Sequence, residues 1–137
     1  MLERWFILAL IATTLFALGS FLGKIASSSD IPFRVYFFEG MGTITVLCTI
    51  ILLKRSEIFT GFALNLPALL MGLCWGIGTV LFIMVLKDAK LSVTVPLTGL
   101  YPAITVILAF VFLGERLGVR EIAGVSLAIV SVVLLAK

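Results

Sequence analysis

Long apolar runs alternate with short polar segments along this chain, and the alternation predicts its secondary structure. The runs are Trp5–Gly23, Phe33–Leu53, Leu66–Leu86, Val93–Leu113 and Val119–Ala136. The segments between them are Lys24–Pro32, Lys54–Asn65, Lys87–Ser92 and Gly114–Gly118. A helix needs about 20 mostly apolar residues to cross a bilayer, because each residue adds about 1.5 Å. The pattern therefore predicts five transmembrane helices in a single domain, residues 1–137.

Helices are expected rather than a barrel, because the runs lack the apolar and polar alternation of barrel strands and backbone groups must pair within hydrocarbon. The composition agrees: 62% of the residues are hydrophobic and 12% are charged, whereas soluble domains have roughly 45–50% and about 25%. The start of the chain resembles a signal peptide, but its apolar run is long enough to span, so we interpret it as the first helix. The fold class is an all-α membrane protein.

The basic residues indicate membrane anchors rather than a nucleic-acid surface. The formal net charge is +3, but Lys and Arg occur singly or in pairs between apolar runs and form no basic stripe. With an odd number of spans the two termini lie on opposite sides. One side then holds Arg4, Lys54, Arg55, Arg116 and Arg120, and the other holds Lys24, Arg34, Lys87, Lys90 and Lys137. This even split predicts insertion in both orientations, because the positive-inside bias is missing.

Enzyme chemistry has little support in the sequence. There is no His, the commonest general base and metal ligand. Cys48 and Cys74 lie inside apolar runs, where Cys usually packs as a small hydrophobe. No Gly-x-Ser-x-Gly turn or other nucleophile and base pair is present. We expect no enzyme activity, no metal site and no cofactor.

Three motifs follow one another within residues 86–125. They are the pair Tyr101-Pro102, the turn Leu113-Gly114-Glu115-Arg116, and a Gly-bearing last run with Gly124. Their order and spacing resemble the EamA-type domain of the drug/metabolite transporter superfamily. The resemblance extends more weakly over the whole chain, with Leu18-Gly19 standing where the family often has Trp-Gly and Lys24 following at a familiar distance.

The resemblance implies a transporter in which two inverted five-helix units surround a central cavity. Most members carry both units in tandem, whereas this chain has one and is similar to the single-unit bacterial and archaeal transporters. It is therefore expected to act as an antiparallel homodimer in the cytoplasmic (inner) membrane, moving a small organic solute by proton or ion coupling. A membrane assembly subunit that pairs with another transporter half is the alternative, and a channel is also compatible with the sequence.

Glu39 is the most informative single residue, because it lies about six positions inside the second run. A charge at such a depth costs on the order of a few kcal/mol unless it is paired or hydrated. One interpretation is a carboxylate that couples transport to a proton or cation. The other is an interfacial Glu that snorkels to the surface or pairs with Arg34 or Lys24. Lys24 and Thr43 are further candidates for binding or coupling.

The fourth run carries hydroxyl side chains on one helical face, at Thr94, Thr98, Tyr101 and Thr105. They would line a cavity and bind a solute, or the Thr hydroxyls would bond to carbonyls of the preceding turn. We favour the cavity, because Pro96 and Pro102 are candidate helix breaks in the same run. Irregular backbone at membrane depth is tolerated where it faces protein or water.

Trp75 lies far from either end of the third run and so is not an interfacial belt residue. It either stacks on an organic or cationic solute or is buried with its N–H bonded to a neighbouring helix. The nearby Gly72 and Gly76 have the spacing that lets helices approach closely, as do Gly19 and Gly23.

The last run has a face of mostly small residues, with Glu121, Gly124, Ala128 and Ser131 at helical spacing. We predict that Gly124, Ala128 and Ser131 pack against another helix at a dimer interface. In the preceding turn, Gly114 is a candidate C-cap, and Glu115 is expected at the start of the last helix, where a carboxylate suits the helix dipole.

Overall fold

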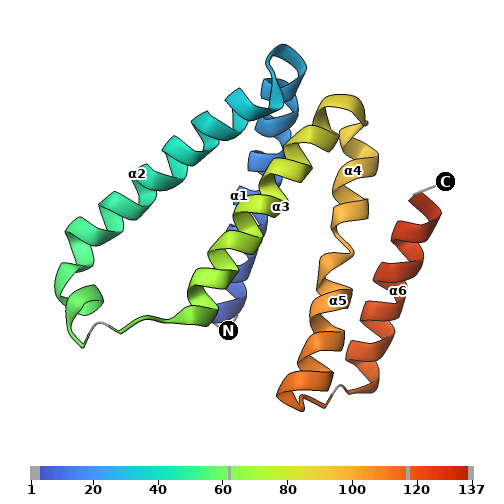
Figure 1. Cartoon of the computed structure of the whole chain (residues 1–137). Coiled ribbons are helices and arrows are strands. Elements are labelled where there is room, and N and C mark those ends of the chain that lie inside the picture. The colour runs from blue at the N-terminus through green and yellow to red at the C-terminus, as the bar shows by residue number, and fades with distance from the viewer. Residues whose placement is uncertain (1–3, 62, 117, 136–137) are drawn as a thin grey trace. The chain divides into compact units, whose positions relative to one another are not determined.

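The computed structural model describes residues 4–61, 63–116 and 118–135, and every regular element in that part of the chain is helical (Figure 1). The chain divides into two compact units, Met1–Asp88 and Ala89–Lys137. The first contains α1 (Arg4–Ser29), α2 (Pro32–Phe59) and α3 (Leu66–Asp88). The second contains α4 (Leu91–Thr98), α5 (Tyr101–Leu108), the π-helical turn η1 (Ala109–Leu113) and α6 (Val119–Leu135).

A tight turn joins α1 to α2. The α1 helix continues past the predicted end at Gly23 as far as Ser29, and α2 begins at Pro32, whose fixed φ and missing N–H suit the first turn of a helix. Across the turn, the Arg34 guanidinium forms an ion pair with the Asp30 carboxylate at 2.9 Å. The predicted polar connector is thus mostly the last turns of α1.

Contact between α1 and α3 depends on a glycine. A Cβ atom on Gly23 would lie only 3.3 Å from Leu86 Cδ1, so the absence of a side chain lets Leu86 pack directly on α1. Leu86 and Ile83 are both buried. The adjacent Lys24 reaches α3 from the same place, and its Nζ donates a hydrogen bond of 2.6 Å to the Leu86 carbonyl. A Lys at the last carbonyls of a helix is favourable, because it satisfies an orphan acceptor and the negative end of the dipole.

Helix α2 meets α3 near its N-terminal end and then diverges from it (Figure 1). Val35 is buried, and the Tyr36 hydroxyl lies 3.2 Å from where a Cβ atom on Gly76 would be. Every side chain from residue 41 to residue 50 is exposed. At Lys54 the backbone leaves helical geometry, with φ −124° and ψ 25°, which kinks the end of α2.

In the second unit, the fourth predicted helix is interrupted. The sequence predicted one helix over Val93–Leu113, but α4 ends at Thr98 and α5 begins at Tyr101. Gly99 and Leu100 form a turn between the two prolines, in which Leu100 N–H bonds to the Leu97 carbonyl. The cause is Pro102, which has no N–H to give to the Thr98 carbonyl one turn earlier.

The turn before α6 follows the prediction at one residue and departs from it at another. Gly114 has φ +66°, the left-handed conformation of a helix C-cap, and its N–H bonds to the Ala109 carbonyl. Glu115 was wrongly expected at the start of the last helix, because α6 begins four residues later, at Val119. Glu121 takes that place, since its Oε2 accepts a 2.6 Å hydrogen bond from Gly118 N–H and so caps the helix.

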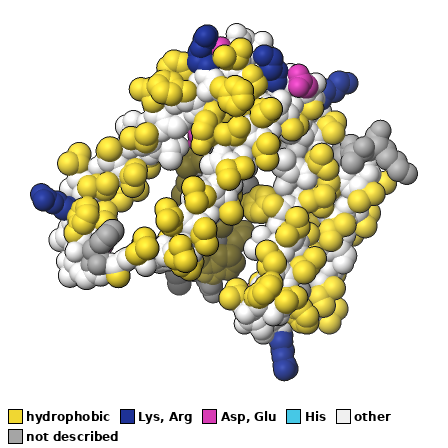
Figure 2. All heavy atoms as spheres, viewed as in Figure 1, with side chains coloured by type: hydrophobic (Ala, Val, Ile, Leu, Met, Phe, Trp, Pro, Cys, Tyr) yellow, Lys and Arg dark blue, Asp and Glu magenta, His cyan; other side chains and the backbone are white. Residues whose placement is uncertain are grey.

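Length and composition match a multi-pass membrane protein. In the described part of the chain, four helical segments are long and apolar enough to cross a bilayer: Arg4–Ser29, Pro32–Phe59, Leu66–Asp88 and Leu91–Leu113. The fifth predicted span corresponds to α6, which has 17 described residues, and Ala136 lies outside them. Hydrophobic side chains cover most of the visible helix surfaces, while charged ones lie mainly near helix ends (Figure 2). Such a surface suits contact with lipid rather than water.

The Gly23 contact generates a prediction about stability. Gly23→Leu should lower the free energy of unfolding by about 1–3 kcal/mol, the usual cost of overpacking, because the new side chain pushes Leu86 and its carbonyl away from Lys24. Thermal unfolding in detergent, followed by circular dichroism, measures the change. Gly19→Leu is the matched control one turn earlier, where a Cβ atom would meet nothing within 4 Å. Equal losses in the two variants would contradict the proposed contact.

Candidate functional site

Glu39 and Thr43 form a side-chain pair on α2. The Thr43 hydroxyl donates a hydrogen bond of 3.2 Å to Glu39 Oε1, one helical turn earlier. Both side chains are exposed in the single chain. Of the two cations considered as partners for Glu39, Arg34 is paired with Asp30 and Lys24 donates to the Leu86 carbonyl. A neutral hydroxyl is therefore the described partner of this carboxylate.

Tyr36 belongs to the same face of α2, and the sequence analysis did not single it out. It precedes Glu39 by three residues and Thr43 by seven, and this spacing places all three on one side of a helix. Its half-buried side chain reaches α3, where the hydroxyl lies against Gly76. The spacing of Tyr36 from Glu39 was a signal available in the sequence. The α2 face thus carries a phenol, a carboxylate and an aliphatic hydroxyl in a row.

Trp75 lies on α3 beside the contact that Gly76 makes with α2. Its side chain is 58% exposed, so it is not packed into the interior of this unit. Its backbone carbonyl accepts a hydrogen bond of 2.8 Å from the Thr79 hydroxyl. An indole at this place offers a flat apolar surface to whatever meets α3.

In the second unit the predicted hydroxyl stripe is divided between two helices. Thr94 and Thr98 lie on α4, whereas Tyr101 and Thr105 lie on α5, beyond the break. The threonines donate hydrogen bonds of 3.0–3.1 Å to backbone carbonyls four residues earlier. Each hydroxyl oxygen keeps lone pairs that accept hydrogen bonds. The three threonines therefore present acceptors, and their hydroxyl donors are used within the helices.

The helix break adds a backbone acceptor to this stripe. Pro102 cannot donate to the Thr98 carbonyl, and Pro96, inside α4, cannot donate to the Ser92 carbonyl. Polar backbone groups inside an apolar span must be satisfied by protein, water or solute. Pro96 and Pro102 thus flank the interruption, and the turn itself lies at Gly99 and Leu100.

The small-residue face of α6 is exposed. Gly124, Ala128 and Ser131 are all exposed, and a Cβ atom on Gly124 would meet nothing within 4 Å. Helix α6 contacts α4 and α5, and Val132, one turn after Ala128, is buried, so this face adjoins the packed side of the helix. The face predicted for dimer packing is thus exposed in the single chain.

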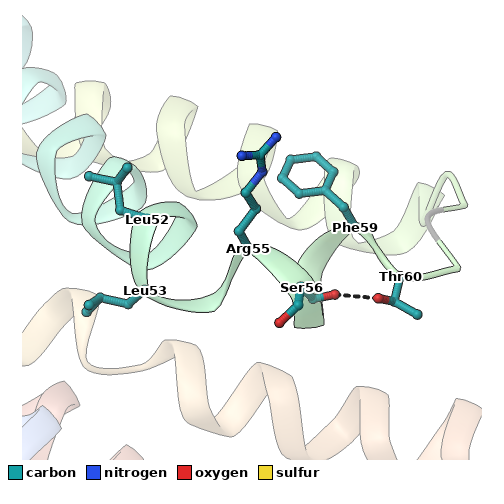
Figure 3. A pocket seen from close by; sticks show the side chains of 6 residues that line it. All are labelled: Leu52, Leu53, Arg55, Ser56, Phe59 and Thr60. Atoms are coloured by element: carbon teal, nitrogen blue, oxygen red, sulfur yellow. Dashed lines mark hydrogen bonds between the residues drawn. The ribbon is translucent and has the colours of Figure 1, made fainter.

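A hollow of about 610 Å³ lies elsewhere, at the kink of α2 (Figure 3). The side chains that line it are Leu52, Leu53, Arg55, Ser56, Phe59 and Thr60. None of the solute-binding candidates from the sequence contributes to it. Among the described residues, no group of three or more His, Cys, Asp or Glu side chains is placed to hold a metal ion.

The candidates fall into two groups, one in each unit of the chain. Glu39, Thr43 and Tyr36 share one face of α2 in the first unit, in which Trp75 also lies. The threonines, Tyr101 and the helix break belong to the second unit, as does the small-residue face of α6. Each group is polar or small within an otherwise apolar surface.

Comparison with known proteins agrees with the apolar helices and their polar interruptions. The family model of the EamA-like transporter family matches residues 3–137. The chain is also similar to an uncharacterized protein of Methanocaldococcus jannaschii, with 34% identity over 130 residues, which are 94% of this chain and 93% of that protein. No solved structure matches it significantly. A match over nearly the whole length shows that the chain belongs to the EamA-like transporter family.

Proposed function

We propose that this protein is a secondary transporter of a small organic solute across the cytoplasmic membrane, driven by a proton or another cation. The observation that carries the proposal is Glu39, a carboxylate in an apolar span whose described partner is the Thr43 hydroxyl. Membership of a transporter family supports it. The five predicted spans, α6 among them, form one transporter unit in this proposal.

The depth of Glu39 explains why it suits coupling. It lies seven residues after Pro32, the first residue of α2, or about 10 Å along the axis at about 1.5 Å per residue. An unpaired carboxylate inside hydrocarbon costs on the order of a few kcal/mol. Binding a proton or a cationic solute removes most of that cost. The charged carboxylate therefore favours a hydrated environment, whereas the protonated or cation-bound form tolerates an apolar one. Movement of Glu39 between these environments links transport of the ion to transport of the solute.

Solute contacts come from the remaining polar and aromatic groups. Tyr36 offers a phenol on the Glu39 face, and Trp75 offers an exposed indole on α3. In the interrupted fourth span, the Thr98 carbonyl and neighbouring hydroxyls supply acceptors. Broken helices near the bilayer midplane commonly form such sites in transporters, because unwound backbone provides polar groups. Substrates with an aromatic or cationic part fit this set of groups.

A second copy would complete the solute pathway. Transporters of this kind enclose the site between two inverted repeats, and this chain supplies one. The even division of Lys and Arg supports an antiparallel homodimer, since neither orientation is favoured on insertion. The exposed face formed by Gly124, Ala128 and Ser131 is the proposed contact between copies. A different transporter half that binds the same face is the alternative.

Replacement of Glu39 tests coupling. Glu39→Gln should reduce proton-driven transport by about 5- to 150-fold, because the amide cannot exchange a proton. This range corresponds to a typical coupling free energy of about 1–3 kcal/mol. Proteoliposomes loaded with a pH-sensitive dye, exposed to ethidium and to a panel of amino acids, measure solute-dependent proton flux. Glu57→Gln is the control, since Glu57 is ion-paired with Lys54 at 2.6 Å near the end of α2. Unchanged flux in the Glu39 variant would make Glu39 structural.

Topology in cells tests the antiparallel dimer. A reporter at each terminus should be found on both sides of the membrane in similar amounts, because Lys and Arg are evenly divided between the two sides. Labelling of a single introduced Cys from outside the cell gives the same information without a fusion. One fixed orientation would rule out the antiparallel homodimer and favour a partner chain of opposite orientation.

Bulk on α6 tests the contact between copies. Gly124→Leu should shift the protein from dimer to monomer by about tenfold or more in dissociation constant, because close approach of helices requires small residues. Analytical ultracentrifugation in detergent measures this shift. Ser126→Leu is the matched control, since Ser126 is also exposed and lies on the opposite side of the helix. Assembly that is unchanged in the Gly124 variant would place the interface elsewhere.

A further inference from the structure

The end of α2 changes direction where its apolar run stops. Between Glu39 and Lys54 the helix has no charged residue, and the backbone then leaves helical geometry at Lys54 before a last turn that ends at Phe59. A run of this kind ends where hydrocarbon gives way to lipid headgroups. The kink therefore lies at the boundary between acyl chains and the polar surface of the membrane.

Exposed apolar side chains and one cationic side chain line the hollow at this kink. Leu52 and Leu53 are 82% and 75% exposed, and Phe59 is 53% exposed. Figure 3 shows the Arg55 side chain rising between Leu52 and Phe59, on the same side of the helix as the Phe59 ring. Ser56 directly follows Arg55, and Thr60 lies one turn later, where its Oγ1 donates to the Ser56 carbonyl at 2.6 Å.

The neighbouring cations Lys54 and Arg55 differ in whether a carboxylate neutralises them. Lys54 Nζ forms an ion pair with Glu57 Oε1 at 2.6 Å. Among the residues that the structure describes, Arg55 has no carboxylate within ion-pair distance. One positive charge is thus neutralised within the helix, whereas the other stands uncompensated above exposed apolar side chains. A ligand that complements this site has an anionic group attached to a hydrocarbon body.

We propose that the hollow is a binding site for the headgroup of an anionic phospholipid. The guanidinium of Arg55 binds the phosphate with two parallel hydrogen bonds, a geometry for which Arg is better suited than Lys. The upper part of the acyl chains lies along Leu52, Leu53 and Phe59. A soluble anion would leave these three side chains uncovered, which is why the lipid is the better occupant. The site does not depend on transport activity.

Bound lipid would hold a part of the protein that has few internal contacts. Side chains 41–50 of α2 are exposed, and the helix has diverged from α3 before it reaches the kink. A headgroup on Arg55 fixes the depth of this helix end in the membrane. The free C-terminal half of α2 is thereby positioned by lipid rather than by a neighbouring helix.

Native mass spectrometry of the delipidated protein in detergent, titrated with phosphatidylglycerol or phosphatidylcholine, tests the proposal. The wild type should prefer phosphatidylglycerol. Arg55→Gln should weaken phosphatidylglycerol binding about fivefold, the value of one basic side chain at an anionic surface. It should weaken phosphatidylcholine binding by a smaller factor, because the choline ammonium already neutralises the phosphate of that lipid. Arg34→Gln is the matched control, because Arg34 is on the same helix but already paired with Asp30.

Two further measurements keep the test decisive. Wild-type affinity for phosphatidylglycerol should fall as the NaCl concentration rises, because salt screens an exposed ionic contact. This measurement uses the wild type alone, so it does not depend on whether a variant folds. Glycerol 3-phosphate, a soluble headgroup without acyl chains, should not compete at concentrations that saturate the lipid. Equal binding of the two lipids, equal losses in the Arg55 and Arg34 variants, or full competition by glycerol 3-phosphate would each overturn the proposal.

Discussion

The absence of water in the bilayer core is the constraint on which the rest of this structure depends. Each backbone N–H and C=O must find a partner within the protein, and long helices achieve this with local hydrogen bonds alone. The consequence is visible in the side chains, since residues such as Phe16 and Leu47 are more than half exposed in the middle of α1 and α2. A surface that would aggregate in water is the expected one in lipid.

The same constraint requires each polar group inside a span to have a bonding partner. Most hydroxyls, such as those of Thr13 and Thr45, bond to a carbonyl one turn earlier and need no further explanation. Glu39 is different, because a helix offers a carboxylate no comparable backbone donor in its interior. The fourth span is different as well, since Pro96 and Pro102 have no N–H to donate to the carbonyls one turn earlier. Glu39 and the break near Gly99 are therefore the places to which the proposed function is assigned.

Contacts between helices depend on a second constraint, because close approach of two helices requires small residues. Lipid chains are as apolar as leucine, so helices associate by close packing rather than by the hydrophobic effect. Gly23 accommodates Leu86, and Gly76 accommodates the Tyr36 hydroxyl. In each case the glycine brings a polar group across the contact: Lys24 reaches the Leu86 carbonyl, and a phenol reaches α3. At Gly124 of α6, by contrast, a Cβ atom would meet nothing within 4 Å.

The sequence by itself determined the membrane class, the approximate positions of the helices, the Gly114 cap and the family. These features depend on local hydropathy, on the conformational freedom of glycine and on motif order, all of which can be read along one segment. Glu39 was found in the same way, because a charge inside an apolar run is conspicuous without any knowledge of the fold. The length of α1 was underestimated, since Lys24 looked like the end of a span when its ammonium in fact reaches across to α3.

Only the tertiary structure decided which faces meet. Tyr36 opposite Gly76 and Leu86 on Gly23 each depend on where a side chain points relative to another segment. The two prolines indicated a break in the fourth span, but its place at Gly99 and Leu100 depends on which carbonyls the turn can still satisfy. Hydropathy is nearly uniform around a helix in lipid, so the pattern along the chain carries little information about the side that packs. Close packing between helices supplies that information, and it exists only once they are assembled.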